Sequence, residues 1–178
     1  KPYLLGHSMG GLVAAAFATT QLNQWEINAL LLSAPGLRVK LTPLMQLKKS
    51  AGYVLRMLKP DLIMEAGLDL NFLSHDRSVI TAYQKDPLVH GKVSVRMALS
   101  LLNFGEVVLE KASKVKLPVW IGHGSDDGIA DPSGSMEFYE KIASTDRSMQ
   151  IYEGLYHEIF NEIRPEPLLD LRNWLSKH

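Results

Sequence analysis

The stretch that decides the fold is Tyr3-Leu4-Leu5-Gly6-His7-Ser8-Met9-Gly10-Gly11. An apolar run precedes a G-x-S-x-G pattern here, and a run of small, helix-compatible residues (11–17) follows it. A serine placed in this way between a strand and a helix lies on a sharp, strained turn, and its hydroxyl projects from the sheet. The glycines leave room for neighbouring backbone to pass close by. The pattern therefore predicts a nucleophile elbow with Ser8 as the nucleophile.

A serine nucleophile needs a histidine to accept its proton and an acid to orient that histidine. Hydrolases built on this elbow carry the three residues in the order serine, acid, histidine, and the same order is found here. The apolar run 117–121 predicts a buried strand that leads into the acidic stretch 122–127, and the run 149–152 predicts another strand before His157. Because the carboxyl ends of parallel strands meet at one edge of a sheet, we expect these side chains to lie together.

Three blocks carry a resemblance to a known family: Gly6-His7-Ser8-Met9-Gly10-Gly11, Gly124-Ser125-Asp126-Asp127 and Ile151-Tyr152-Glu153-Gly154-Leu155-Tyr156-His157. They resemble the catalytic blocks of the monoacylglycerol lipase and lysophospholipase branch of the α/β-hydrolase superfamily. The stretch 83–91 is similar to that branch's cap segment, so the resemblance runs through nearly the whole chain. It implies a serine hydrolase that cleaves carboxylic esters of medium or long acyl chains, with a monoacylglycerol or a lysophospholipid as substrate.

The acid has three neighbouring candidates in the sequence. The family pattern places it three residues after the block's glycine, which selects Asp127 as the partner of His157. From the residues alone, Asp126 and Asp131 stay open as alternatives. Asp131 precedes Pro132, and an acid followed by proline also suits the N-cap of a helix.

The expected fold class is α/β: the second half of a doubly wound α/β-hydrolase sheet of parallel strands, with an inserted helical cap. Strand patterns at 3–6, 27–33, 118–122 and 149–153 alternate with helical patterns at about 9–22, 133–144 and 165–177. The interval between Pro35 and Leu117 contains no strand pattern and is too long for a plain connection, which predicts a helical cap. The predicted organisation is a hydrolase core at 1–36, a cap at 37–115 and the core again at 116–178.

The strand at 3–5 predicts a missing N-terminal hydrolase segment. In this superfamily other strands precede the elbow strand, and an early loop provides one oxyanion donor, while the backbone N–H of Met9 would provide the other. A strand that is apolar on both faces is not normally left at an open sheet edge. We therefore expect a further segment, on the same or another polypeptide, to pair with this strand and complete the oxyanion hole.

The composition excludes several other kinds of function. The 178 residues include 19 basic and 19 acidic side chains, and a formal net charge of zero gives no bulk attraction to nucleic acid. The chain has no cysteine and no histidine pair at metal-ligand spacing around a glutamate, so we expect no metal site. A serine hydrolase needs no cofactor, and the sequence indicates none. The lack of cysteine permits any redox compartment, and we expect a cytoplasmic or peripheral membrane location.

The segment 38–60 contains basic residues and no acid: Arg38, Lys40, Lys48, Lys49, Arg56 and Lys59. Apolar residues recur on it at Leu44, Leu47, Ala51, Val54, Leu55 and Leu58. A helix here would be amphipathic and cationic, which suits peripheral contact with an anionic lipid surface. The same pattern suits a cap helix that packs its apolar stripe on the protein and keeps its lysines in water, and the two interpretations are compatible.

Several side chains are candidates for contact with the substrate: His7, Leu44, Met45, Tyr53, Leu68, Phe72 and Phe104. The turn directs His7 away from the serine's own direction, so we expect packing or substrate contact from it rather than proton transfer. We expect His123 to form a hydrogen bond near its strand end. For His75, His90 and His178 the sequence identifies no partner.

Two other functions fit the same sequence. The nearer one is a different activity on the same fold, such as a general carboxylesterase, an aminopeptidase-like hydrolase or a cofactor-free perhydrolase, because fold and triad do not determine the substrate. The more distant one is a non-catalytic binding or scaffold role. A serine, an acid and a histidine in fitting order favour the enzyme.

Overall fold

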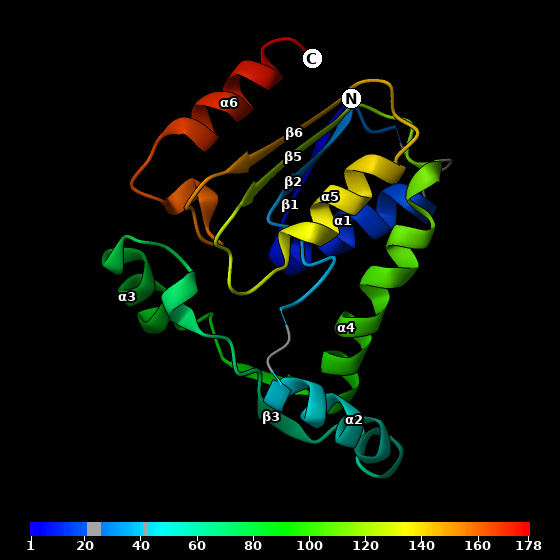
Figure 1. Ribbon diagram of the computed structural model, residues 1–178, viewed down its shortest axis with the longest axis vertical. Helices are drawn as coiled ribbons and strands as arrows, with labels where there is room; N and C mark the ends of the chain where they lie inside the picture. The colour runs from blue at the N-terminus through cyan, green and yellow to red at the C-terminus, as the bar shows by residue number, and fades with distance from the viewer. Residues whose placement is uncertain (21–25, 41–42) are drawn as a thin grey trace.

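The computed structural model describes residues 1–20, 26–40 and 43–178, except for the side chains of 43–45, 47 and 48. Its centre is a parallel four-stranded sheet in the order β1-β2-β5-β6 (Figure 1). The strands are β1 (Tyr3–His7), β2 (Ala29–Ser33), β5 (Val119–Gly124) and β6 (Arg147–Tyr152). The parallel α/β sheet expected from the sequence is confirmed.

Helices cover both faces of this sheet (Figure 1). They are α1 (Ser8–Thr20), α4 (Val95–Glu110) and α5 (Pro132–Lys141) on one face, and α6 (Glu166–Leu175) on the other. Successive strand residues point to opposite faces, so Leu30 and Leu32 belong to the first core, whereas Leu31 packs in the second with Trp174. All five residues of β2 are buried, which explains why this strand is a continuous apolar run.

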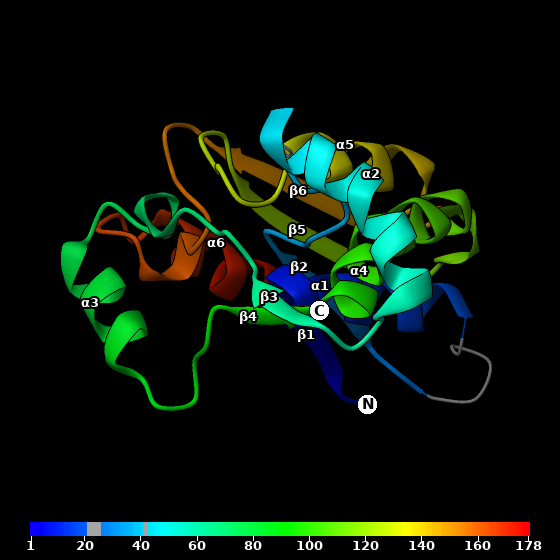
Figure 2. The same cartoon turned by 90° about the horizontal axis from the view of Figure 1, so that it is seen from below.

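Most of the inserted segment lies beyond the carboxyl ends of the strands (Figure 2). Its elements are α2 (Pro43–Leu58), β3 (Ile63–Glu65), η1 (Leu70–Phe72), α3 (Arg77–Lys85), β4 (Lys92–Ser94), α4 and η2 (Ala112–Lys114). The expectation of a cap without strands is wrong, because β3 and β4 form an antiparallel pair with Ile63 opposite Ser94. Each strand is three residues long and partly exposed, so neither shows the alternation by which a strand is predicted.

Two features tie the cap to the core. Helix α4 runs from the cap into the main core, where Val108 and Leu109 are buried. Arg38 forms ion pairs with Glu106 of α4 at 3.1 Å and with Glu137 of α5 at 2.6 Å. The hydrogen bond that Arg38 donates to Glu106 raises the pKa of Arg38 above its usual value. Two carboxylates therefore engage the charge of Arg38, one of the basic residues of the segment 38–60, and attach the cap to the core.

β1 has a free edge among the described residues. Its neighbour in the sheet is β2, with Tyr3 opposite Ala29 and His7 opposite Ser33. Tyr3 is 40% exposed and Leu5 is 49% exposed. This exposure is unusual for apolar residues of a parallel strand, which is normally covered.

No helix within the described residues is both long enough and apolar enough to cross a bilayer.

Candidate active site

Ser8 lies where β1 ends and α1 begins, and its φ angle is +53°. Residues other than glycine rarely adopt this left-handed backbone conformation, so the turn is strained. A Cβ on Gly6 would overlap the backbone carbonyl of Gly10, and a Cβ on Gly11 would lie 2.8 Å from Pro35. Because these two glycines have no side chain, the strand, the helix and the loop at Pro35 can approach one another closely around Ser8.

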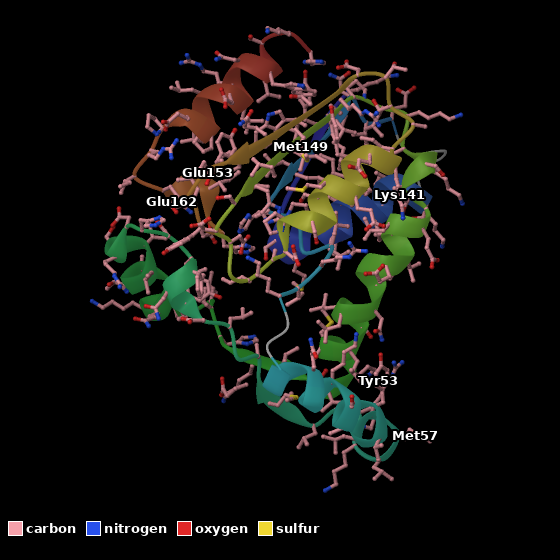
Figure 3. All side chains as sticks on the ribbon, viewed as in Figure 1. Tyr53, Met57, Lys141, Met149, Glu153 and Glu162 are labelled. Atoms are coloured by element: carbon pink, nitrogen blue, oxygen red, sulfur yellow. The ribbon has the colours of Figure 1, made fainter. Side chains whose placement is uncertain are left out.

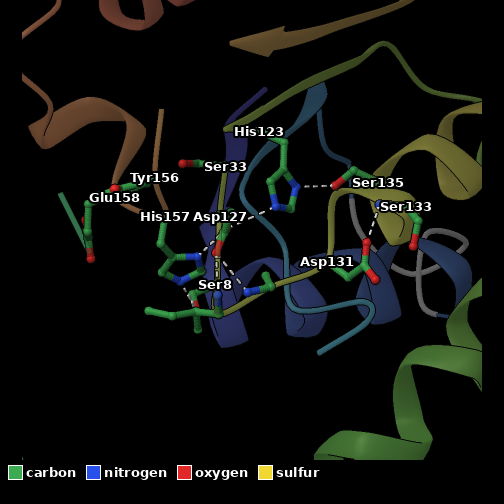
Figure 4. Close-up of polar contacts among 12 residues, drawn as sticks. Ser8, Ser33, His123, Asp127, Asp131, Ser133, Ser135, Tyr156, His157 and Glu158 are labelled. Atoms are coloured by element: carbon green, nitrogen blue, oxygen red, sulfur yellow. Dashed lines mark hydrogen bonds and ion pairs between the residues drawn. The ribbon is translucent and has the colours of Figure 1, made fainter. Parts of the chain in front are cut away.

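The imidazole of His157 lies between Ser8 and Asp127 (Figure 4). Its Nε2 is 2.8 Å from the Ser8 Oγ, and its Nδ1 is 2.6 Å from the Asp127 Oδ2. Asp127 is fully buried, and its Oδ1 accepts hydrogen bonds from the N–H groups of Ile129 at 2.7 Å and Ala130 at 2.9 Å. These bonds hold the carboxylate in one orientation toward the imidazole.

The two other acids considered from the sequence lie elsewhere. Asp126 is exposed and accepts a hydrogen bond from the Ser125 hydroxyl at 2.8 Å. Asp131 is the N-cap of α5, where its carboxylate accepts from the N–H of Ser133 at 2.9 Å. The structure thus brings Asp127 to His157 and gives its two neighbours other partners.

The protonation of this group of residues follows from their surroundings. Burial raises the pKa of the Asp127 carboxyl, but hydrogen bonds from His123 and His157 oppose it, and the net effect holds the pKa well below its usual range. Asp127 is therefore ionised at neutral pH and accepts a hydrogen bond from Nδ1–H of His157. In the neutral imidazole tautomer that donates from Nδ1, Nε2 of His157 carries no hydrogen and is placed to accept the proton of Ser8.

The loop that carries His157 is held between the cap and the sheet. On the cap side, the N–H of His157 donates to the Phe72 carbonyl at 3.0 Å, and the N–H of Glu158 donates to the Leu73 carbonyl at 2.8 Å. On the sheet side, a Cβ on Gly124 at the end of β5 would overlap the backbone of the same loop. The glycine therefore permits the close approach that brings His157 to the strand end.

Glu162 fastens this loop to the cap, and no sequence pattern indicated it. Its side chain is 0% exposed and accepts hydrogen bonds from the N–H of Tyr156 at 2.9 Å and from the N–H and Nδ1 of His75, both at 3.0 Å. The His75 ring also stacks on Tyr156 with centroids 3.8 Å apart. Burial raises the pKa of Glu162, but these hydrogen bonds lower it by more. Because 87 residues separate His75 from Glu162, only the folded chain reveals the pair.

The remaining histidines also have partners. The Nδ1 of His90 accepts from the N–H of Lys92 at 3.3 Å, and the Nε2 of His178 lies 3.0 Å from a carboxylate oxygen of Asp146. His123 forms the expected hydrogen bond near its strand end, with Asp127 as its partner.

His7 lies beside the candidate site without joining it. Its Nδ1 is 3.1 Å from the Ser33 carbonyl oxygen, and its Nε2 is 3.2 Å from Oε1 of Glu158. The hydrogen bond from His7 lowers the pKa of Glu158. The rings of His7 and His157 are 4.8 Å apart, so His7 flanks the imidazole while its own nitrogens are engaged elsewhere.

The predicted substrate-contacting residues occupy different places. Phe72 packs over Gly128 in the loop after Asp127, meets Tyr156 edge-on at 5.5 Å, and accepts a hydrogen bond from the backbone N–H of His157. Tyr53 lies on α2 (Figure 3), where its hydroxyl donates to Asn103 of α4 at 3.0 Å, so its observed role is to join two cap helices. Leu68 and Phe104 are each 43% exposed, on the loop after β3 and on α4 respectively. The side chains of Leu44 and Met45 lie outside the described residues.

Comparison with known proteins places this geometry in a family. A family model described as serine aminopeptidase, S33, matches residues 1–164. The chain belongs to this family. The relatives and structures below identify it more closely as an α/β-hydrolase of the monoacylglycerol lipase branch, as the sequence blocks predicted.

Curated relatives of this chain include proteins named as lipases. It is 32% identical to a monoacylglycerol lipase of Mycolicibacterium smegmatis over 98% of this chain and 62% of that protein. It is 35% identical to the phospholipase YtpA of Bacillus subtilis over 90% of this chain and 61% of that protein. The chain therefore spans about three fifths of the length of these relatives.

A solved structure agrees closely with the fold. The crystal structure of a monoacylglycerol lipase from Paleococcus ferrophilus aligns with a TM-score of 0.88 at 30% identity, covering 99% of this chain and 67% of that one. A soluble variant of the monoglyceride lipase of Saccharomyces cerevisiae, in complex with a substrate analog, aligns with a TM-score of 0.87 at 27% identity, over 99% and 62% of the two chains. The expected correspondence to part of a hydrolase sheet is consistent with these coverages.

Proposed function

We propose that this protein is a serine hydrolase that cleaves carboxylic esters of medium or long acyl chains, with a monoacylglycerol or a lysophospholipid as substrate. The observation that carries the proposal is the pair of hydrogen bonds on His157, at 2.8 Å to Ser8 and at 2.6 Å to Asp127. The same contacts argue against a non-catalytic role, because a strained, partly exposed serine beside an oriented imidazole has the geometry of an activated nucleophile.

In the proposed reaction, Oγ of Ser8 attacks the ester carbonyl carbon while Nε2 of His157 takes the serine proton. His157 then returns this proton to the leaving alcohol, which leaves the acyl group on Ser8 as an ester. A water molecule, deprotonated by His157, attacks the acyl-enzyme carbonyl carbon, and His157 then gives this proton to Oγ of Ser8 as the bond to the acyl group breaks and the fatty acid is released. Throughout the cycle the Asp127 carboxylate orients the imidazole and stabilises its charged form.

The oxyanion formed in each half of the reaction needs two hydrogen-bond donors. We assign the first to the N–H of Met9, which lies in the first turn of α1, where N–H groups have no acceptor within the helix. We assign the second to a hydrolase segment that pairs with the free edge of β1. The exposure of Tyr3 and Leu5 on that strand supports such a partner strand.

The substrate class rests on the relatives of this chain. Proteins named as monoacylglycerol lipases and a phospholipase are similar to this chain over at least 90% of its length, which supports a lipid ester. The family model is described as a serine aminopeptidase, so an amide substrate is the competing candidate. Both reactions use the same triad, and only the acyl-binding and leaving-group sites differ.

We further propose that α2 contacts lipid surfaces. Near its carboxyl end Val54, Met57 and Leu58 are 63%, 85% and 74% exposed, and Figure 3 shows Met57 at the outer end of this helix. Arg56 and Lys59 are exposed beside them. Apolar side chains next to basic ones suit the interface of an anionic membrane.

Two measurements on the intact protein test the proposed function. Labelling with a fluorophosphonate probe would report an activated serine, and Ser8→Ala should abolish the labelling. Turnover of glyceryl esters and p-nitrophenyl esters of increasing acyl length, compared with aminoacyl p-nitroanilides, would separate a lipid esterase from a short-chain esterase and from an aminopeptidase. Preference for aminoacyl amides would reject the lipid substrate while retaining the serine mechanism.

A further inference from the structure

His123 is a buried imidazole that the proposed reaction does not use. It lies on the side of Asp127 opposite His157 (Figure 4). Its Nε2 is 3.1 Å from Oδ2 of Asp127, and its Nδ1 is 2.7 Å from Oγ of Ser135 on α5. All three side chains are 0% exposed. Since Oδ2 also accepts from Nδ1 of His157 at 2.6 Å, one carboxylate oxygen lies between two imidazoles.

Hydrogen-bond geometry assigns the protons in this chain of residues. The ionised Asp127 is only an acceptor, so Nε2 of His123 must carry a hydrogen and donate it. A neutral His123 then has an unprotonated Nδ1, which accepts the hydroxyl hydrogen of Ser135. Ser135 therefore donates to His123, and His123 donates to Asp127. Each buried side-chain polar atom of these three residues has a hydrogen-bond partner.

We propose that His123 is a positioning residue for the proposed triad: by donating a hydrogen bond to Oδ2, it holds the Asp127 carboxylate in its orientation toward His157. The inference rests on the proposed function. A buried carboxylate that loses one donor binds a proton more tightly. It would then hold the Nδ1 proton of His157 more closely, and only the N–H groups of Ile129 and Ala130 on Oδ1 would still orient it besides His157.

Two substitutions of His123 separate the hydrogen bond from the packing. His123→Phe keeps an aromatic ring in the buried site but has no donor, whereas the side-chain amide of His123→Gln can still donate to Asp127. For the phenylalanine variant we expect kcat to fall about 10- to 100-fold with KM nearly unchanged. In this variant we also expect a shift of the downfield NMR resonance that belongs to the Nδ1–H proton of His157. The glutamine variant should recover most of kcat and return the resonance toward its original position.

Ser135→Ala and Ser144→Ala form a matched pair of buried hydroxyl deletions. Ser144 is 4% exposed, and its hydroxyl donates to the Asp146 carbonyl at 2.9 Å. It takes no part in the hydrogen bonds that link Ser135, His123 and Asp127. We expect only the Ser135 variant to shift the His157 resonance, because only it removes a hydrogen bond to the His123 ring. Equal resonances in the two variants would contradict the proposal.

The remaining outcomes also decide the matter. A folded phenylalanine variant with the original kcat and resonance overturns the proposal, and so does a glutamine variant as impaired as the phenylalanine one. Should the phenylalanine variant fail to fold, the glutamine variant and the serine pair still carry the test. If the unmodified protein turns over no ester, the proposed function fails, while the resonances of the same variants still show whether His123 positions Asp127.

Discussion

The backbone N–H of His157 donates to the backbone carbonyl of Phe72 at 3.0 Å, so the proposed general base is hydrogen-bonded to the cap by its own main chain. Phe72 also packs over Gly128 in the loop that follows Asp127. The end of one short cap helix therefore contacts both loops that position the triad. Displacement of this part of the cap would move the imidazole and the acid loop together, which makes the cap part of the site's support as well as its cover.

Ser8→Ala should remove ester turnover on the intact protein while leaving the fold in place. Loss of the nucleophile in a serine triad costs on the order of 10⁶ in kcat, and alanine is no larger than serine at this strained turn. Turnover of a p-nitrophenyl ester, with circular dichroism as the control for folding, checks this. Activity of more than a few per cent in folded protein would reject Ser8 as the nucleophile.

Asp127→Asn should lower kcat by roughly 10⁴, because the amide no longer stabilises the tautomer and the charge of His157 that the reaction needs. Asp126→Asn and Asp131→Asn are the matched controls. Asparagine is as good an N-cap as aspartate, so the Asp131 variant should keep both stability and activity. A crippled Asp131 variant beside an active Asp127 variant would reverse the assignment.

Glu162→Gln should destabilise the folded protein by about 1–3 kcal/mol, because a buried amide NH₂ would face groups that are themselves donors. The loss should depend on pH. The folded-state pKa of Glu162 lies below its unfolded value of about 4.3, so its contribution is present above that pH and disappears as pH falls through the lowered pKa.

Denaturant unfolding of both proteins between neutral and acid pH measures this difference for Glu162. Glu166→Gln is the control, since that carboxylate is 48% exposed and pairs with Arg164 at the surface. The difference in unfolding free energy between the original protein and Glu162→Gln should shrink toward acid pH. A difference that is constant with pH would mean that the carboxylate's charge does not stabilise the loop.

Gly11→Ala and Gly10→Ala should have opposite effects on stability. A methyl group at Gly11 would lie 2.8 Å from Pro35, which predicts a cost of about 1–3 kcal/mol. Nothing lies within 4 Å of the same position at Gly10, where alanine should be neutral or should stabilise α1 by up to about 1 kcal/mol. Thermal unfolding of the two variants tests this, and a destabilised Gly10 variant would indicate that another segment covers this turn.

Replacing Arg56 and Lys59 by glutamine should weaken binding to anionic vesicles, since each basic residue near such a surface contributes about 1 kcal/mol. Added salt should weaken the binding of the original protein more than that of the variant. The matched control is Lys111→Gln with Lys114→Gln, because both are exposed cations that follow α4, Lys111 as its C-cap and Lys114 in η2. Co-sedimentation with vesicles measures the effect, and equal losses in the two double variants would mean that α2 does not form the contact.

Local sequence patterns predicted the strand, turn and helix around Ser8, because a turn between an apolar strand and a small-residue helix is encoded by neighbouring residues. They also predicted the parallel sheet, since buried strands such as β2 are continuous apolar runs. The tertiary structure decided what depends on distant contacts. Asp126, Asp127 and Asp131 are the same residue type, and only the folded chain directs the carboxylate of Asp127 toward His157. Glu162 likewise bonds to His75, which is 87 positions away in the sequence. Arg38 likewise acquires its two carboxylate partners only when the cap folds onto the core.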